Sequence, residues 1–387
     1  MKKINQTSQD LIIIGGGIMG LMTAYFASSK FNKITIIEKL KIGNESATSF
    51  NHYSRSIYNG YLDTGYVNLA RQSQKLWKDI ENKSGKKLYI ECGCLNIASK
   101  KITADIKNTY AQKSYDVRKK LGIKGEYLNQ NQLKKRFPQF NADLGTLEND
   151  GGYLFLPAIT KYLLKTLKAK QVIFIENITI SKIEEKANEV YVQTNQGDYT
   201  SSKLVITAGL GTNEVLKTVL DNDLMLPLKP EPPLKMYLFP PRNKRRMFMP
   251  DKFPIFASLD IGIWGHPITN KEIPGVKIGY YFPQKKTKKY TRDLEEVLDF
   301  VANYIPALKD AKAVDYTDSI PCSYDLVVDD NFIVGKLPKY KNIVLGAGFL
   351  GTGYKFGPVI GKILTQLTSE DKTQYDISKF SPARFIM

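Results

Sequence analysis

The sequence predicts an α/β fold: a Rossmann-like domain made of discontinuous segments, joined to a second, α+β domain built on an antiparallel sheet. Two observations carry this prediction. A β-branched run ending in glycines opens the chain, and two later apolar strands also end in glycine turns that lead into helices. The 387 residues are enough for two domains that each bury a core without disulfides or metals.

The N-terminal segment has the order strand, turn, helix, strand. Leu11–Ile14 is a continuous apolar run of the kind buried on both faces of a parallel sheet. The sequence Gly15-Gly16-Gly17-Ile18-Met19-Gly20 follows with the spacing G-x-G-x-x-G, and Leu21–Ser29 is the expected helix. Lys33–Ile37 is the expected second strand, and Glu38 ends it.

Each residue of this motif has a physical role in dinucleotide binding. Gly15 allows the tight turn, Gly17 lets the backbone approach a pyrophosphate, and Gly20 permits close helix packing. Glu38 is placed to accept hydrogen bonds from an adenosine ribose, and its charge disfavours the 2′-phosphate of NADP. The motif by itself leaves FAD and NAD open.

Composition excludes several classes of protein. Three cysteines and two histidines make zinc chemistry and a disulfide scaffold improbable and fit a reducing compartment. The charged start Met1-Lys2-Lys3 and the apolar run Leu11–Phe26 are similar to a signal peptide. The glycine triplet and the short run argue against a secretory or membrane-spanning segment. We therefore expect a cytoplasmic protein without a transmembrane segment.

Two further strands extend the predicted nucleotide-binding domain. Lys203–Gly209 and Asn342–Gly348 are apolar and end in small residues, with helices expected from Gly211 and over Phe356–Leu367. Ile173–Thr194 is expected to form a small meander within the same domain. The predicted bounds are 1–85, 151–215 and 321–387 for this domain, and 86–150 and 216–320 for the second, substrate-binding domain.

The second domain differs in composition. Residues 86–150 are rich in lysine and are expected to be mostly helical after a strand at Tyr89–Ala98. The later insertion is expected to contain the proline-rich stretch Pro227–Pro241, short strands over Ile255–Trp264 and Val276–Phe282, and an amphipathic helix near Arg292–Tyr304.

Several motifs now resemble a known family. They are Gly275–Tyr280, Cys322-Ser323-Tyr324, the glycine-rich stretch Gly346–Phe356, and Asp376–Phe380 near the end. In this order they are similar to the D-amino-acid-oxidase-like flavoproteins, and within these to monomeric sarcosine oxidase and N-methyltryptophan oxidase. The resemblance runs nearly end to end, is weakest at 100–145 and 240–275, and implies an FAD-binding fold with FAD as cofactor.

The resemblance also implies how FAD is held. Cys322 matches the cysteine that forms a thioether with the 8α-methyl of the flavin, for which a thiolate is the required nucleophile. A buried structural cysteine is the alternative. Besides Gly15, Gly17, Gly20 and Glu38, the residues expected at the cofactor are Ile18, Met19, Lys39, Ser54, Arg55, Ile180, Ala208, Gly209, Gly348, Gly351, Gly353 and Lys355.

Three cations match functional positions of the family. Lys277 matches the lysine that activates O₂ beside the flavin, where a fixed charge stabilises the developing anion. Arg55 matches the arginine beside the flavin ring, and both residues are expected to be catalytic. Lys355 matches the residue that binds the substrate carboxylate, ahead of a helix that would begin near Phe356. A solvent-exposed surface charge is the alternative for each.

The sequence departs from the family around the substrate. Tyr58 stands where sarcosine-oxidase-type enzymes carry a second arginine, and a tyrosine cannot replace a bidentate guanidinium. Asn51 stands where a histidine precedes the first arginine. Trp264 and Tyr281 are the aromatic candidates for substrate contact, with core packing as the alternative. We expect a more aromatic and less cationic pocket.

These features predict an FAD-dependent amine oxidase. The α C–H of an amino acid or N-alkyl amino acid would pass a hydride to flavin N5, the imine would hydrolyse, and O₂ would reoxidise the flavin to give H₂O₂. Three alternatives stay open: a dehydrogenase that uses a quinone or carrier acceptor, an oxidase that modifies the wobble uridine of tRNA, and a flavin-binding protein without turnover.

The tRNA alternative depends on charge. The chain carries 56 Lys and Arg against 38 Asp and Glu, a net charge of +18 with a pI of about 9.4. Its best phosphate-binding candidates are the runs Lys244–Arg246 and Lys285–Lys289, and short charge runs are usually solvated loops. Nucleic acid is therefore a disfavoured partner. The expected partners are a small amine or amino acid and O₂, and the expected state is a monomer.

Overall fold

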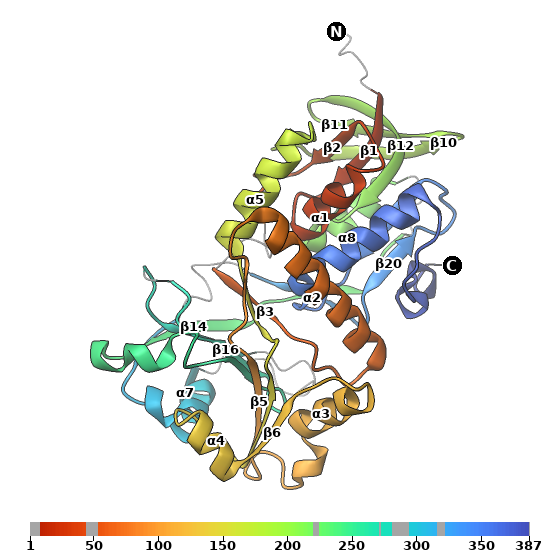
Figure 1. Ribbon diagram of the computed structural model, residues 1–387. Helices are drawn as coiled ribbons and strands as arrows, with labels where there is room; N and C mark the ends of the chain where they lie inside the picture. The colour runs from red at the N-terminus through yellow and green to blue at the C-terminus, as the bar shows by residue number, and fades with distance from the viewer. Residues whose placement is uncertain are drawn as a thin grey trace. The chain divides into compact units, whose positions relative to one another are not determined.

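The computed structural model describes residues 8–43, 53–219, 224–270, 272–280, 294–315 and 322–386. The chain divides into two compact units, each made of discontinuous segments. The first unit comprises Met1–Asn51, Pro157–Glu231 and Cys322–Met387, and the second comprises His52–Leu156 and Pro232–Pro321. The mixed α/β class predicted from the sequence is confirmed (Figure 1).

The first unit is built on an eight-stranded sheet with a parallel centre. Its parallel strands lie in the order β9-β2-β1-β12-β21, and β1 pairs with β2 and β12 in register. Antiparallel β20 extends one edge beyond β21. β11 pairs antiparallel with the first half of β12, and β10 pairs antiparallel with β11. The strands are β1 (Ser8–Ile14), β2 (Ile34–Ile37), β9 (Ile173–Ile175), β10 (Ile180–Lys186), β11 (Glu189–Thr194), β12 (Gly197–Ile206), β20 (Ile333–Lys336) and β21 (Ile343–Ala347). Because parallel strands end at the same sheet edge, the turns after β1, β2, β12 and β21 meet there.

Helices α1 (Ile18–Ala27) and α8 (Gly353–Ser369) lie side by side against this sheet (Figure 1). Three glycines at helical spacing in α8, Gly353, Gly357 and Gly361, face α1. A Cβ on Gly361 would lie 2.6 Å from the backbone carbonyl carbon of Met22, and a Cβ on Gly353 would lie 3.1 Å from the Met19 side chain. The missing side chains therefore let the N-terminal turns of the two helices approach each other closely.

The remaining elements of the first unit complete its core. One apolar cluster joins strands of the sheet, β10 and β11 included, to the segment around Leu216 and Leu226. A two-stranded sheet joins residues 228–231 to 324–327. The elements are α5 (Leu156–Ala169), α6 (Thr212–Leu216), β13 (Leu228–Glu231), β19 (Tyr324–Val327), and the short 3₁₀ helices Gly209–Gly211, Ser378–Phe380 and Pro382–Arg384.

The second unit is built on an eight-stranded sheet in the order β18-β14-β17-β16-β15-β5-β7-β6, in which only the β15–β5 pair is parallel. The strands are β5 (Cys94–Ala98), β6 (Glu126–Asn129), β7 (Leu144–Glu148), β14 (Leu234–Phe239), β15 (Ile255–Ser258), β16 (Ile263–His266), β17 (Val276–Tyr280) and β18 (Lys312–Asp315). One face is apolar and packs on α7 (Leu294–Tyr304), on α4 (Gln130–Arg136) and on the 3₁₀ segment Arg242–Phe248. The sequence predicted an antiparallel sheet with its helices on one side. This is wrong in part, because α4 and α7 lie on the apolar face and α3 (Tyr110–Lys120) lies on the other.

A small sheet and a long helix complete the second unit. The sheet has the order β3-β8-β4, and α3 lies against β5 and β7 on the face of the large sheet that does not carry the apolar cluster. The elements are β3 (Ser54–Ile57), α2 (Thr64–Ser84), β4 (Tyr89–Ile90), α3 (Tyr110–Lys120), β8 (Gly152–Phe155), and the 3₁₀ helices Ile106–Asn108 and Pro306–Leu308.

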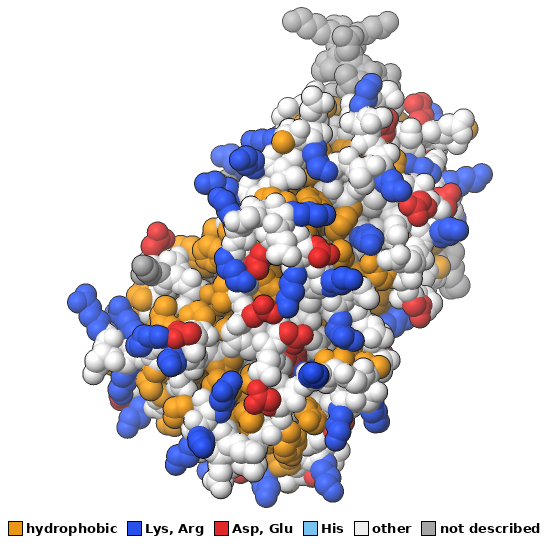
Figure 2. Space-filling view, viewed as in Figure 1, with side chains coloured by type: hydrophobic (Ala, Val, Ile, Leu, Met, Phe, Trp, Pro, Cys, Tyr) orange, Lys and Arg blue, Asp and Glu red, His pale blue; other side chains and the backbone are white. Residues whose placement is uncertain are grey.

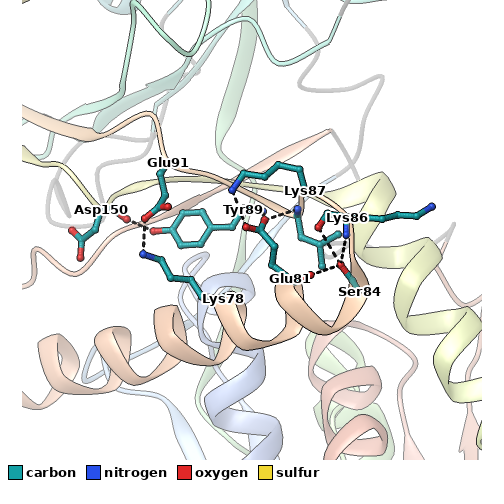
Figure 3. A network of polar contacts seen from close by, with 9 residues as sticks. Lys78, Glu81, Ser84, Lys86, Lys87, Tyr89, Glu91 and Asp150 are labelled. Atoms are coloured by element: carbon teal, nitrogen blue, oxygen red, sulfur yellow. Dashed lines mark hydrogen bonds and ion pairs between the residues drawn. The ribbon is translucent and has the colours of Figure 1, made fainter.

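A polar network ties α2 to the second unit (Figure 3). The Glu81 carboxylate accepts hydrogen bonds of 2.7 Å from the backbone N–H groups of Leu88 and Tyr89 and pairs with Lys87 at 2.8 Å. The Tyr89 hydroxyl donates to the Asp150 carbonyl. Because the Glu81 bonds cross from the helix to β4, and β4 pairs with β8, residues 52–85 belong to the same unit as 86–156.

The unit bounds differ from the predicted domain bounds at three places. Residues 52–85 and 151–156 lie in the second unit, and residues 216–231 lie in the first because β13 pairs with β19. The expected strand at Tyr89–Ala98 contains β4 and β5, but the expectation that the rest of 86–150 is mostly helical is wrong in part, since β6 and β7 lie there beside two helices. Ile173–Thr194 is also more than a meander, because β9 joins the parallel sheet.

The helix expected from Gly211 is only one turn long, over α6, and α8 begins at Gly353, earlier than predicted. For α6 and α8 the hydrophobic pattern predicted a helix correctly. The residues at which each helix begins and ends depend on tertiary contacts. Among the described residues no helix combines the length and apolar character needed to cross a bilayer.

Candidate active site

The glycine-rich turn after β1 has the geometry that the motif requires. Gly15 has φ +102°, and a Cβ there would lie 2.7 Å from the carbonyl carbon of Thr207, with the carbonyl oxygen still nearer. The Gly15 carbonyl oxygen occupies the position where Gly20 would carry a Cβ. Only glycine fits at both positions, so the first turn of α1 lies directly over the strand ends.

Glu38 points back at this turn. Its carboxylate accepts hydrogen bonds from the backbone N–H of Gly16 at 2.7 Å and of Leu40 at 2.9 Å. Gly17 is the N-cap of α1 and has no side chain to satisfy the first-turn N–H groups. An uncapped helix N-terminus beside a carboxylate at the end of the second strand fits a pyrophosphate and a ribose. The residues present therefore fit a dinucleotide such as FAD.

The other predicted cofactor residues of the first unit lie around the same sheet edge or close to it. Ala208 and Gly209 follow β12, and the Ala208 Cα lies 3.1 Å from the position of a Gly15 Cβ. Ile18 and Met19 are buried in the first turn of α1, and half-buried Ile180 begins β10. The structure gives Lys39 a different setting, because its side chain is exposed and pairs with Glu214 at 2.8 Å.

Two motifs that carry the resemblance lie against each other in the first unit. Gly351 has φ +70°, and a Cβ there would lie 2.5 Å from the Tyr324 ring. The Asp325 carboxyl is buried, and its pKa rises to about 6 because burial outweighs the hydrogen bonds from the backbone N–H groups of Phe349, Gly348 and Leu350. Tyr324 and Asp325 thus join the strand after Cys322 to the turn 348–351, and Cys322 itself is half-buried with a free thiol.

Lys355 lies within the first turn of α8 and is 4% exposed. The N-cap, Thr352, directs its hydroxyl to the Phe349 carbonyl at 3.2 Å instead of capping the helix. The structure therefore places this lysine inside the helix, four residues after the turn 348–351, whereas the sequence placed it just ahead of the helix. Burial excludes the alternative of a solvent-exposed charge at this position.

In the second unit, the large sheet has a second face that is rich in polar and aromatic side chains. Val276, Ile278 and Tyr280 belong to the apolar cluster, so Lys277 points to the opposite face, as strand alternation predicts. Lys277 is 3% exposed, and its Nζ lies 5.2 Å from the centroid of the Trp264 ring. This lysine is therefore a buried cation and not a surface charge.

The Ser54 carbonyl oxygen brings the two predicted catalytic residues together. Lys277 Nζ donates to it at 3.3 Å, and Arg55 Nη1 donates to it at 3.2 Å. The Ser54 hydroxyl contacts Nδ1 of His266 at 2.8 Å, and the Ser56 hydroxyl contacts Nε2 at 2.7 Å. The second unit thus gathers two cations, a tryptophan and an imidazole around one short strand, β3.

Tyr58 lies in a different environment, among tyrosines and a buried ion pair. Its ring stacks on Tyr61 at 5.4 Å, and burial raises the pKa of the Tyr58 hydroxyl well above its usual value. Glu148, which is fully buried, accepts a hydrogen bond from the Asn59 N–H at 2.8 Å and lies 3.7 Å from Arg118. Burial raises the pKa of Glu148, and the nearby Arg118 lowers it again in part. The carboxylate fixes the turn that follows Tyr58.

Sequence reasoning missed His266, Ser56, Asp325 and Glu148. The spacing in sequence could have indicated His266 and Ser56. His266 lies two residues after Trp264 on one strand, and Ser56 lies two residues after Ser54 on another, so each pair shares a face of its strand. Asp325 directly follows the Cys322-Ser323-Tyr324 motif, but its partners are 23 or more residues away in the chain. Of the predicted site residues, Tyr281 lies outside the described residues, as does Asn51.

The fold and the glycine turn beside Glu38 define a class, the dinucleotide-binding proteins. The family model described as FAD dependent oxidoreductase matches residues 10–367. The chain therefore belongs to this family of FAD-dependent oxidoreductases, as the motifs predicted.

Three known proteins illustrate the similarity. Human peroxisomal sarcosine oxidase is 30% identical over 97% of this chain and 96% of its own. N-methyl-L-tryptophan oxidase of Yersinia pestis (strain Pestoides F) is 26% identical over 97% of this chain and 99% of its own. The crystal structure of L-proline dehydrogenase from P. horikoshii shares the fold, with a TM-score of 0.79, 19% identity and 98% coverage of both chains.

Proposed function

We propose that this protein is an FAD-dependent amine oxidase that acts on an amino acid or N-alkyl amino acid and reduces O₂ to H₂O₂. The observation that carries the proposal is the buried Lys277, held at the Ser54 carbonyl together with Arg55 in a flavoprotein fold. The names of the relatives, sarcosine oxidase and N-methyl-L-tryptophan oxidase, support an amino-acid amine as the substrate class.

FAD, when bound, supplies the redox chemistry by taking two electrons from the amine and passing them to the acceptor. The residues proposed to hold it are the glycine turn, the N-terminus of α1 and Glu38 in the first unit, together with the turn 348–351. The uncapped N–H groups would meet the pyrophosphate, and the carboxylate would meet the ribose. The glycines exclude side chains from the space that the dinucleotide backbone needs.

Lys277 is proposed to stabilise the negative charge that develops on O₂ during its reduction. A fixed cation in a buried site acts strongly because little water screens it and no reorganisation is needed. Lys277→Met should slow reoxidation by O₂ by about 10²-fold or more and leave anaerobic reduction by substrate nearly unchanged. Lys235→Met, which alters a second buried lysine on the same sheet face, is the matched control. Equal slowing of both half-reactions would refute this role.

Cys322 is proposed to hold FAD through a thioether bond. Its half-buried free thiol lies two residues before Tyr324, whose ring packs against Gly351. Acid precipitation should leave the yellow colour in the protein pellet of the wild type and of Cys92→Ala, and release it from Cys322→Ala. Release of all colour from the wild type would show that FAD is bound without a covalent link.

Lys355 is proposed to bind the substrate carboxylate, since a buried cation in the first turn of a helix favours an anion. Tyr58 is proposed to supply aromatic surface where the family has a second arginine, and Trp264 to stand among the aromatic side chains around the amine. Lys355→Met should raise KM for an amino acid and leave KM unchanged for the corresponding amine without a carboxylate. Equal changes for both substrates would exclude a carboxylate contact.

An anaerobic screen of N-methyl, cyclic and D-amino acids, followed by bleaching of the flavin absorbance, identifies the substrate. Peroxide formed per turnover in air then separates an oxidase from a dehydrogenase. One molecule of peroxide per amine oxidised is expected. A yield near zero with rapid reduction of a quinone would instead assign the protein to the dehydrogenases.

The charge pattern of the described residues gives RNA less support as a substrate than the net charge of the sequence does. Lys244 pairs with Asp310 at 2.7 Å, and Arg246 forms two hydrogen bonds to Asp251. Figure 2 shows Lys and Arg dispersed over the visible face and interspersed with Asp and Glu. The run Lys285–Lys289 lies outside the described residues. Two of the three cations in the described run are thus already neutralised by acidic partners.

A further inference from the structure

His266 is a buried imidazole next to the proposed oxygen-activating lysine. It ends β16, where it is the register partner of Lys277 in β17, so both side chains point to the same face of the sheet. Its exposed fraction is 1%. The ring lies between two aromatic neighbours, with centroids 5.6 Å from Trp264 and 6.3 Å from Tyr153. These contacts fix the plane and the direction of the imidazole.

Both ring nitrogens of His266 contact serine hydroxyls of one strand. Nδ1 lies 2.8 Å from Ser54 Oγ, and Nε2 lies 2.7 Å from Ser56 Oγ. Residues two apart in an extended strand project to the same side, so one ring spans both serines. A neutral imidazole has one donor and one acceptor, and a hydroxyl can act as either, so both contacts are satisfied in either tautomer. The imidazole therefore fixes β3 relative to β16 at two points.

The strand held in this way carries the oxygen that receives both cations. The Ser54 carbonyl accepts from Lys277 Nζ and from Arg55 Nη1. The hydroxyl and the carbonyl of Ser54 belong to the same residue, so a displacement of the β3 backbone at Ser54 moves both contacts together. A change at His266 is thus passed to the Lys277 ammonium through a single residue.

We infer that His266 is a positioning residue, which holds β3 so that the Ser54 carbonyl fixes the ammonium of Lys277. This inference rests on the proposed role of that lysine in O₂ reduction. The stabilisation that a buried charge gives to a developing anion depends on their separation, so an ammonium displaced from its site loses part of its effect. A general base would need a ring nitrogen aimed at a reacting proton, and both nitrogens of His266 are engaged by serines.

The test compares His266→Leu, His266→Gln and Ser56→Ala in the full-length protein. Leu removes both polar contacts, Gln keeps one donor and one acceptor group, and Ser56→Ala removes one contact and leaves Ser54 intact. Ser99→Ala is the matched control, because Ser99 is also a buried serine of the second unit and bonds Asp143 at 3.0 Å, away from these residues. Two readouts are used: amide hydrogen exchange of the peptide that contains residues 53–57, and the two half-reactions of the flavin.

We expect His266→Leu to speed exchange of the 53–57 peptide and to slow reoxidation by O₂ by about tenfold, with anaerobic reduction changed less than about threefold. His266→Gln should recover most of the rate, Ser56→Ala should lie between, and Ser99→Ala should match the wild type. Because Ser56→Ala and His266→Gln are mild changes, they keep the test decisive if His266→Leu does not fold.

Three results would overturn parts of this reasoning, and they are distinguishable. If Lys277→Met slows reoxidation while none of the His266 and Ser56 variants alters the exchange or the rate, the positioning role is wrong and the proposed function stands. If Lys277→Met leaves reoxidation unchanged, the proposed role of Lys277 fails. Slowing of both half-reactions to the same extent by Ser56→Ala would also overturn the inference, because it would show a general structural effect.

Discussion

Gly279→Ala tests how the sheet holds Trp264, the aromatic candidate for substrate contact. A Cβ on Gly279 would lie 2.7 Å from Cη2 of the indole, and two other ring carbons would be closer still. Non-bonded carbons need about 3.5–4.0 Å, so the ring has to withdraw by about 1 Å or more. Such overpacking costs about 1–3 kcal/mol. The displaced ring also loses its contact with the Lys277 ammonium, at 5.2 Å, which contributes about 0.5–2 kcal/mol.

We therefore expect Gly279→Ala to lower the free energy of unfolding by about 1.5–5 kcal/mol, measured from urea midpoints by circular dichroism. In a Trp264→Ala background the new methyl group has space, and the same change should cost less than about 0.5 kcal/mol. KM for the amine should rise in Gly279→Ala. It should stay unchanged in Gly265→Ala, the control, whose Cβ would lie 2.5 Å from the Phe256 ring on the apolar face.

An equal loss of stability from Gly279→Ala with and without Trp264 would refute the reasoning, because the clash would then involve other groups. A rise of KM in Gly265→Ala as large as that in Gly279→Ala would refute the assignment of Trp264 to the substrate. The two measurements are independent, so the packing argument and the functional argument can fail separately.

Three further predictions follow from buried groups. The pKa of Asp325, about 6 against an ordinary 3.8, is raised on folding. Below about pH 4 the carboxyl is largely protonated in both the folded and the unfolded state, so it changes the free energy of unfolding little. Above about pH 6 its ionisation lowers the free energy of unfolding by about 3 kcal/mol. Urea unfolding should show the stability of the wild type relative to Asp325→Asn falling by about 3 kcal/mol from pH 4 to pH 7, and a constant difference would contradict the raised pKa. Gly361→Ala should destabilise the protein and lower its FAD content more than Gly357→Ala, because its Cβ would meet the backbone of α1 and not a side chain; similar losses in thermal unfolding would refute this. Arg118→Met should cost about 3–5 kcal/mol by leaving Glu148 unpaired, and adding Glu148→Gln should recover part of this in the same urea assay.

The sequence by itself determined the nucleotide-binding half of the fold. The β-branched run, the G-x-G-x-x-G spacing and Glu38 are neighbours in the chain, and each has a local physical requirement that only a few residue types meet. The resemblance extended this to the FAD-dependent oxidoreductase family, which the matching family model confirms. The order of the strands and the burial of the glycine turn agree with it.

The alternation of Val276, Lys277 and Ile278 was also enough to place the lysine opposite the apolar face. It could not show what covers that face. The partners of Lys277 are Ser54 and Trp264, and the distance in sequence to Ser54 is 223 residues. The residues next to a lysine in the sequence do not show whether its side chain is buried by such distant contacts or exposed to solvent.

Only the tertiary structure decided how the candidate site is supported. His266 joins Ser54 and Ser56 across more than 200 residues of sequence, and Asp325 is bonded by the amides of a turn that follows two strands later. It also decided that residues 52–85 belong to the second unit, through the contacts of Glu81. A sequence pattern reports the periodicity and backbone needs of neighbouring residues. Hydrogen bonds between distant segments depend on which strands pair and in what register, and these follow from the packing of the whole unit.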